Sequence, residues 1–198
     1  MKKIILASGS PRRQELLRML NIPFEVSVSS VDETTDISSP DERVKHLALI
    51  KARAVAENCE NDSLIIGSDT VVAFNGKILN KPADDDDARY MLHTLSGNTH
   101  QVFTGLAIIT KDSDGGVCET AYADCTEVMM NQISDDEIEN YIASKECRDK
   151  AGAYAIQGKS SVFIKGINGD YYTVMGLPVR LVYKALKENG IDITEFWK

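Results

Sequence analysis

The feature that most constrains this chain is a repeated order, in which a short apolar run is followed by a signal for the start of a helix. Residues 3–7 (KIILA) have the composition of a buried strand, and Ser10-Pro11 follows them as a helix N-cap and first helical residue. The alternating run 24–28 is followed in the same way by the capping-box sequence Ser39-Pro40-Asp41-Glu42. This order predicts an α/β fold in which helices flank a mixed, twisted sheet, in one folded unit over residues 1–198.

The rest of the chain continues this mixture of strands and helices. We expect a buried strand over 64–67 that ends at Ser68-Asp69-Thr70, an extended continuation over 71–74, and a hairpin turn at Asn75-Gly76. A second capping box at Ser134 predicts a helix, and Asn168-Gly169 predicts a hairpin between two strands. Further helices are expected from Asp84 and after Pro178, and β-rich runs over 100–110 and 117–130.

The charge balance is acidic and narrows the classes of partner. The chain has 22 Lys and Arg against 30 Asp and Glu, a net charge of −8. Nucleic acids and anionic membranes reward a basic surface, so we expect neither as a partner. No apolar run approaches the roughly 18–20 residues that a membrane span needs. The apolar stretch 4–7 is also much shorter than the core of a signal peptide, so we expect a cytoplasmic protein.

Cysteine and histidine spacing gives no sign of a thiolate or imidazole metal site. There is no CxxC pair and no HxxxH motif. In a reduced cytoplasm we expect the cysteines to be free thiols. The residues are Cys59, Cys118, Cys125, Cys147, His46, His93 and His100.

The first candidate site is the segment 8–13 (SGSPRR), where a strand passes into a helix N-terminus. Free N–H groups and the positive end of the helix dipole make such a terminus an anion site. The positive charges of Arg12 and Arg13 are unfavourable at this end of the dipole, and a bound phosphate would offset them. Alternatively, they are two solvated arginines after an ordinary N-cap. The segment lacks the GxxxxGK[ST] pattern, which excludes a P-loop nucleoside triphosphatase.

Two carboxylates form the second candidate site. Asp69 is expected at the carboxyl end of a buried strand, where ligands of α/β sheets bind, although an Asp there can also simply cap a turn. Glu33 lies in a polar loop, where a lone carboxylate is usually solvated. Together, Glu33 and Asp69 could supply the oxygen ligands that Mg²⁺ prefers.

Two lysines are candidates for binding phosphate. Lys51 falls within the apolar stripe of the helix that starts after Ser39, so it either extends past the edge of the core or reaches an anion site. Lys81 precedes a proline and, taken alone, has the pattern of a surface lysine. The acidic run 84–87 suits a helix N-terminus and needs no metal to explain it.

These segments together carry a resemblance to a known family. The matching residues, in order along the chain, are SGSPRR (8–13), Glu33, Lys51, SDTVV (68–72), NKP (80–82), LSGNTHQVFTG (95–105), DKAGAYAIQG (149–158) and GLP (176–178). This set resembles the Maf proteins, which are nucleotide pyrophosphatases. Asn80 and Ala155 stand where the family often has glycine, and Ala155 would be strained if that position needs a positive φ.

The resemblance implies a fold similar to the inosine-triphosphate pyrophosphatases, as a single domain over residues 1–198 with two lobes around a cleft. It also implies hydrolysis of a nucleoside triphosphate to the monophosphate and pyrophosphate, which removes non-standard or excess nucleotides. Arg12, Thr70 and Gln157 are similar to the positions of the branch that acts on dTTP and UTP. A homodimer is implied as well.

For this reaction we expect a divalent cation, Mg²⁺ or Mn²⁺ with Co²⁺ as a third candidate, to be held by Glu33 and Asp69. Asp69 is the expected general base for a water that attacks the α-phosphorus. Gln157 is expected to bind the O4 and N3–H edge of uracil or thymine. Phosphate oxygens are expected to contact Ser8, Arg12, Arg13, Lys51 and Lys81.

One alternative function belongs to another class. The Maf name is associated with septum formation, so the chain could be a non-enzymatic nucleotide-binding regulator of cell division. The carboxylates and the inward-facing Lys51 favour an enzyme, because a pure interaction module needs neither.

Overall fold

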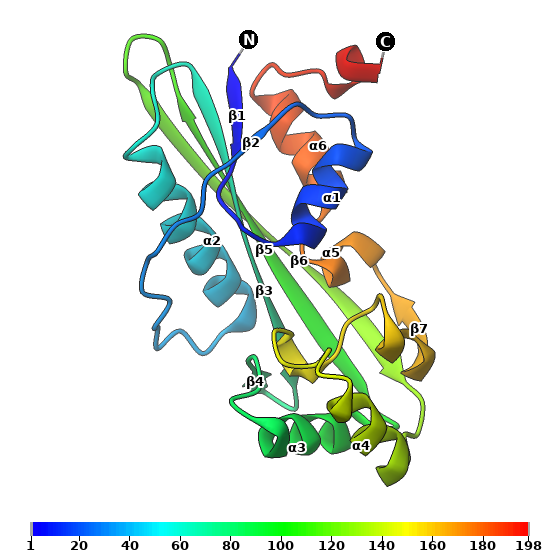
Figure 1. Cartoon of the computed structure of the whole chain (residues 1–198). Coiled ribbons are helices and arrows are strands. Elements are labelled where there is room, and N and C mark those ends of the chain that lie inside the picture. The colour runs from blue at the N-terminus through cyan, green and yellow to red at the C-terminus, as the bar shows by residue number, and fades with distance from the viewer. Residues whose placement is uncertain (1, 198) are drawn as a thin grey trace. The chain divides into compact units, whose positions relative to one another are not determined.

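The computed structural model describes residues 2–197, shown in Figure 1. The chain divides into two compact units. Unit 1 comprises Met1–Asp69, Thr104–Asp124 and Gly176–Lys198, and unit 2 comprises Thr70–Phe103 and Cys125–Met175. Each unit is therefore assembled from segments that are far apart in sequence. The expectation of one domain over residues 1–198 stays a prediction.

The strands form the mixed sheet that the sequence predicts. Their order is β2-β1-β3-β5-β6-β7, with β4 paired to β3. β1 pairs in parallel with both β2 and β3, whereas the β3–β4 and β6–β7 pairs are antiparallel. The strands are β1 (Lys3–Leu6), β2 (Glu25–Val26), β3 (Ser63–Phe74), β4 (Lys77–Leu79), β5 (Thr99–Lys111), β6 (Val117–Met130) and β7 (Ile164–Asn168).

Helices cover this sheet. In unit 1, α2 lies on one side of the strands and α1 and α6 lie on the other (Figure 1). The α-helices are α1 (Pro11–Met19), α2 (Pro40–Ala56), α3 (Asp85–Leu95), α4 (Asp135–Ala143), α5 (Tyr171–Met175) and α6 (Val179–Glu188). Three 3₁₀ segments, Ala151–Ala153, Lys159–Phe163 and Ile193–Trp197, complete the described structure. No described helix combines the length and the apolar character that crossing a membrane requires.

Two glycines allow α2 to lie against the sheet at backbone distance. A Cβ on Gly67 of β3 would lie 2.2 Å from the carbonyl oxygen of Ala48, and a Cβ on Gly105 of β5 would lie 2.1 Å from that of Val44. Any side chain at either position would push the helix away. Because Val44, Ala48 and Lys51 recur at the spacing of one helix face, the same approach brings Lys51 to the sheet.

The core of unit 2 is built around α3 and α4. The apolar faces of both helices are buried in one cluster with residues of β5 and β6. On the surface of that cluster, Arg89 of α3 is paired with Glu139 of α4. The predicted capping box at Ser134 is present, and Asp84 caps α3 through the N–H of Asp87. The Asn75-Gly76 hairpin is also confirmed, between β3 and β4.

Local predictions are wrong in β3, before α2 and before α5. The strand expected over 64–67 does not end at Ser68-Asp69-Thr70 but forms one strand, β3, with the extended run expected over 71–74, so Asp69 lies within a strand. Ser39 precedes α2 but makes no cap, because its hydroxyl donates to the Asp41 carboxylate instead. The segment after Asn168-Gly169 is helix α5 rather than a returning strand.

Candidate functional site

The centre of the candidate site is an ion triplet on Lys51 of α2. Its Nζ lies 2.6 Å from Oε2 of Glu33 and 2.6 Å from Oδ1 of Asp69. The Lys51 and Asp69 side chains are 12% and 11% exposed, whereas that of Glu33 is 55% exposed. The two predicted carboxylates and one of the predicted lysines are therefore together, and the triplet carries one net negative charge.

Backbone geometry explains why Asp69 faces Lys51. Side chains alternate between the two faces of a strand, so Gly67 and Asp69 point the same way. Gly67 admits the Ala48 turn of α2 to the sheet, and Lys51 lies three residues further along the same helix face. Lys51 is an inward-facing lysine held by carboxylates at the edge of the core, which is the position predicted from the apolar stripe.

A second group of predicted residues lies where β1 passes into α1. Arg13 donates from Nη1 to Oγ of Ser8 at 3.1 Å and from Nε to the carbonyl oxygen of Gly176 at 2.8 Å. Ser8 Oγ also accepts from the N–H of Ser10 at 3.3 Å. Ser10 begins α1 without a side-chain cap, so its predicted position is correct and its predicted capping bond is not.

Electrostatics connect Arg13 with the ion triplet. Burial is the largest effect on the Arg13 guanidinium and lowers its pKa, and the positive charge of Arg12 lowers it further. The carboxylates of Asp69 and Glu33 act in the opposite direction and raise this pKa. An arginine stays protonated at physiological pH despite such a shift. Unit 1 therefore gathers Ser8, Arg12 and Arg13 with two carboxylates and a lysine, a mixed-charge surface that suits a polyphosphate accompanied by a cation.

Ser68 and Gly176 hold this arrangement together, and sequence reasoning assigned no role to either of them. Ser68 is fully buried, and its Oγ lies 2.8 Å from the carbonyl oxygen of Gly105 and 2.9 Å from that of Gly176. The Gly176 carbonyl is thus shared by Ser68 of β3 and Arg13 of α1. A serine at the end of the apolar run LIIGS was the available signal, since a buried hydroxyl needs a partner.

The remaining predicted residues belong to unit 2. Thr70 is half-buried in β3, and strand alternation directs its side chain to the face opposite Asp69. Lys81 is exposed and Gln157 is half-buried. Within this unit the carbonyl of Asn80 accepts from the N–H of Gly152 at 3.1 Å, which ties the NKP segment to the segment that carries Gln157. That these three side chains join the carboxylates at one substrate stays a prediction.

The carboxylates of Glu33 and Asp69 fit a divalent cation in chemistry. Their oxygens already converge on one positive centre, the ammonium of Lys51. Mg²⁺ takes oxygen ligands and is commonly held by one or two carboxylates together with substrate phosphates. Within residues 2–197 no group of three or more His, Cys, Asp or Glu side chains converges as a metal site. Further ligands would therefore come from substrate oxygens or water.

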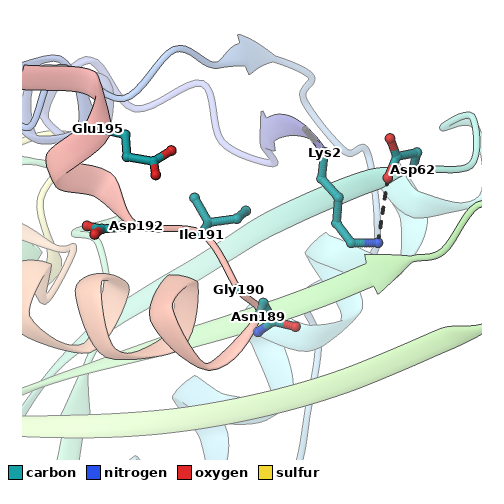
Figure 2. Close-up of a pocket in the computed structure, with 7 residues that line it drawn as sticks. All are labelled: Lys2, Asp62, Asn189, Gly190, Ile191, Asp192 and Glu195. Atoms are coloured by element: carbon teal, nitrogen blue, oxygen red, sulfur yellow. Dashed lines mark ion pairs between the residues drawn. The ribbon is translucent and has the colours of Figure 1, made fainter. Parts of the chain in front are cut away.

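A pocket of about 250 Å³ lies elsewhere in unit 1 and contains none of the predicted residues (Figure 2). Lys2 is its basic member and pairs with Asp62 at 3.9 Å and, outside the pocket lining, with Asp112 at 2.6 Å. Its lining residues are Lys2, Asp62, Asn189, Gly190, Ile191, Asp192 and Glu195. A single paired ammonium among carboxylates is unsuited to a triphosphate.

Comparison with known proteins adds to this geometry. Residues 3–189 match the family model described as Maf-like protein. Proteins named dTTP/UTP pyrophosphatase from Bacillus cereus strains G9842 and ATCC 10987 / NRS 248 are 50% and 51% identical to this chain over 195 residues. Each alignment covers 98% of this chain, and they cover 99% and 93% of the two relatives.

Solved structures give a more distant similarity. A HAM1 protein from Coxiella burnetii aligns with a TM-score of 0.46 and 16% identity, over 95% of this chain and 100% of that one. The Staphylococcus aureus Ham1 protein aligns with a TM-score of 0.45 and 14% identity over the same shares. The assignment of the chain rests on the family model and the sequence relatives.

Proposed function

The chain belongs to the Maf family, and from this membership we propose that it hydrolyses dTTP and UTP to the nucleoside monophosphate and pyrophosphate. Its relatives at 50% and 51% identity carry the name dTTP/UTP pyrophosphatase. The observation that carries the proposal is the convergence of Glu33 and Asp69 on Lys51, next to the arginines of α1. Hydrolysis of excess or non-standard nucleotides is the cellular role that follows.

Charge neutralisation is the main task of the unit 1 residues. Phosphoryl transfer depends on positioning and on electrostatic stabilisation more than on covalent chemistry. Arg12 and Arg13 stay charged at all working pH values and donate to phosphate oxygens in a planar geometry. Ser8, already held by Arg13, adds a hydroxyl donor at the start of α1. The pyrophosphate leaving group gains most from these contacts, because its negative charge increases as the bond breaks.

Asp69 acts as the general base in this proposal. Its Oδ1 is held by Lys51, which fixes the carboxylate plane and leaves Oδ2 to accept the proton of the attacking water. Lys51 keeps the carboxylate in place and stabilises its charge in the nearly buried site. The water then attacks the α-phosphorus, the bond to the bridging oxygen breaks, and pyrophosphate leaves.

A divalent cation is proposed as the cofactor, with Glu33 and Asp69 as the residues that would hold it. When bound, such a cation offsets phosphate charge as a Lewis acid. Mg²⁺ and Mn²⁺ are the expected ions, and Co²⁺ is a third candidate. Support comes from the donor set, two carboxylates whose oxygens converge.

Base selection is proposed for the residues of unit 2. The amide of Gln157 offers one acceptor and two donor hydrogens, which match the N3–H and O4 of uracil and thymine. Thr70 would contribute to the same preference, as would Arg12 of unit 1, and Lys81 would contact phosphate. A polar site of this kind rejects other bases because its own groups would be left unpaired.

A nucleotide panel tests the proposal. The protein is incubated with dTTP, UTP, CTP, dATP and dGTP in the presence of Mg²⁺ or Mn²⁺, and the products are separated by ion-exchange chromatography. We expect monophosphate and pyrophosphate, with dTTP and UTP turned over fastest. Release of orthophosphate would indicate cleavage at the γ position, and absence of turnover with every nucleotide would favour a non-enzymatic regulator.

We also propose that the protein acts in the cytoplasm and as a homodimer. A cytoplasmic location is supported by its nucleotide substrates and by Cys59, Cys118 and Cys147, which form no disulfide in the part of the chain that the structure describes. Cell fractionation tests the location. The homodimer is supported by the family resemblance, and light scattering during size-exclusion chromatography tests it.

A further inference from the structure

We propose that Ser160 is a positioning residue for substrate selection, because its hydroxyl closes the loop that carries Gln157. This inference rests on the proposed function, in which Gln157 contacts the base. Ser160 itself contacts no substrate in the proposal. Its effect is on where the Gln157 amide lies before a nucleotide arrives.

The closing contact is a double hydrogen bond to a single residue. Oγ of Ser160 accepts from the N–H of Ala155 at 3.0 Å and donates to the carbonyl oxygen of Ala155 at 2.8 Å. Ser160 is fully buried and Ala155 is half-buried, which limits the access of water to both bonds. The hydroxyl therefore closes a loop of residues 155–160, with Gln157 in its middle. Ala155 is not among the residues of positive φ, so the strain considered from the sequence is absent, and the positive φ falls on Ala153.

The loop is also anchored at its entry. Tyr154 directly precedes it, and the Tyr154 hydroxyl lies 2.7 Å from Nε2 of His100. Both rings are buried, and they meet edge to face with centroids 5.2 Å apart. A bulky buried side chain at this point fixes the direction in which the chain enters the loop.

The exit of the loop has its own anchor. Glu146 accepts from the N–H of Lys159 at 2.9 Å, at the start of the 3₁₀ segment that contains Ser160. Gly158 has a φ of +86°, and a Cβ there would lie 2.5 Å from the Glu146 carboxylate. Glycine thus permits both the turn and the close approach of Glu146. Three anchors therefore hold the six residues, and Ser160 is the one that joins the two ends.

This arrangement matters because Gln157 selects by hydrogen-bond geometry. A displacement of about 1 Å in a positioned group can lower a rate by about 10²-fold. Without the Ser160 hydroxyl the loop must be ordered when the nucleotide binds, which raises KM for the preferred bases. Nucleotides that make no use of Gln157 are affected less. The expected signature is a loss of selectivity rather than a uniform loss of activity.

The test compares kcat/KM for dTTP with kcat/KM for CTP in the wild type and in Ser160→Ala. We expect this ratio to fall by about 10- to 100-fold, mainly through KM for dTTP. The matched control is Ser63→Ala, which removes another buried hydroxyl, bonded to the carbonyl of Glu60 at 2.8 Å. The control should lose stability and keep the ratio. An unchanged ratio in Ser160→Ala would overturn the inference.

Two further measurements keep the inference separate from the proposed function. Hydrogen exchange should be faster over residues 155–158 in Ser160→Ala than in the wild type, and equal exchange would overturn the positioning role even if the wild type hydrolyses no nucleotide. Should Ser160→Ala fail to fold, Glu146→Ala removes the exit anchor from a partly exposed position. Glu146→Ala should also lower the ratio of kcat/KM for dTTP to kcat/KM for CTP. An unchanged ratio in this variant would count against the inference. Absence of pyrophosphate release by the wild type would overturn the proposed function alone.

Discussion

Lys51 of α2 and Asp69 of β3 form a nearly buried ion pair, with Nζ and Oδ1 separated by 2.6 Å. Burying two charges costs solvation energy, and the attraction offsets that cost only when the geometry is good and other polar groups take part. Glu33 supplies the second carboxylate, and Gly67 supplies the backbone approach that brings α2 to the strand. The pair therefore depends on both of these neighbours for its geometry.

Asp69→Asn tests the proposed general base. The amide keeps the size of the side chain and can still accept from Lys51, so the fold should persist. Proton abstraction should be lost, and we expect pyrophosphate release from dTTP to fall by about 10²–10⁴-fold. Asp62→Asn is the control, because Asp62 is exposed and its φ of +58° is one that Asn tolerates. Turnover of Asp69→Asn close to that of the wild type would remove Asp69 from the mechanism.

Gly67→Ala tests the backbone contact that places Lys51. The new methyl group would lie 2.2 Å from the Ala48 carbonyl oxygen, so α2 must move away from β3. We expect the free energy of unfolding to fall by about 1–3 kcal/mol and kcat to fall with it. Urea unfolding and pyrophosphate release measure the two effects. Gly116→Ala, where the nearest contact would be 3.4 Å, should change neither, and equal behaviour of the two variants would contradict the explanation.

How far the sequence predicted this structure depends on whether the signal was local. The capping box at Ser134 and the hairpin at Asn75-Gly76 are encoded in neighbouring residues, and both are present. The inward position of Lys51 followed from helix periodicity. Two other local signals failed. The Ser39 hydroxyl bonds Asp41 instead of capping α2, and helix α5 replaces the strand expected after Asn168-Gly169.

Other features depend on contacts between segments distant in sequence, which no local pattern contains. That Asp69 lies inside β3 rather than at its end follows from the pairing of β3 with its neighbours. The contact of Gly67 with Ala48 and the bond from Arg13 to Gly176 likewise join elements far apart in the chain. The candidate residues themselves were recognisable from their type and from the family resemblance, whereas the residues that hold them were not.

The stability of the protein should decrease in mild acid because of His100. Burial lowers the pKa of His100 to about 4, against about 6.5 in an unfolded chain. As the pH falls from about 6.5 towards 4, the unfolded state binds a proton that the folded state does not, so the free energy of unfolding falls by up to about 1.4 kcal/mol per pH unit. Urea unfolding at pH 7.5 and pH 5 measures this loss. Between these two pH values the free energy of unfolding of His100→Gln should fall less than that of the wild type. That of His46→Gln, a change at an exposed position, should fall as much as that of the wild type.

Lys51→Met should increase the affinity of the site for a divalent cation in the absence of nucleotide. In the wild type the ammonium compensates Glu33 and Asp69, so the fold needs no metal and chelation should leave its circular dichroism unchanged. Without the ammonium, two carboxylates remain close together and repel each other, and a cation that binds between them relieves the repulsion. A unit charge about 4 Å away contributes about 4 kcal/mol near a protein surface, so a gain of at least about tenfold in affinity is expected.

Calorimetric titration with Mn²⁺ measures that affinity directly, and thermal unfolding reports it independently, because a ligand of the folded state raises the Tm according to its Kd. Lys45→Met is the matched control, since Lys45 lies on the same helix and pairs with Glu42 in its first turn. Pyrophosphate release should fall in Lys51→Met even as the cation binds more tightly, because Asp69 loses the contact that fixes its plane. If Mn²⁺ binds Lys51→Met no more tightly than the wild type, then Glu33 and Asp69 are not the residues that hold the cation, and the carboxylates serve only to pair with Lys51.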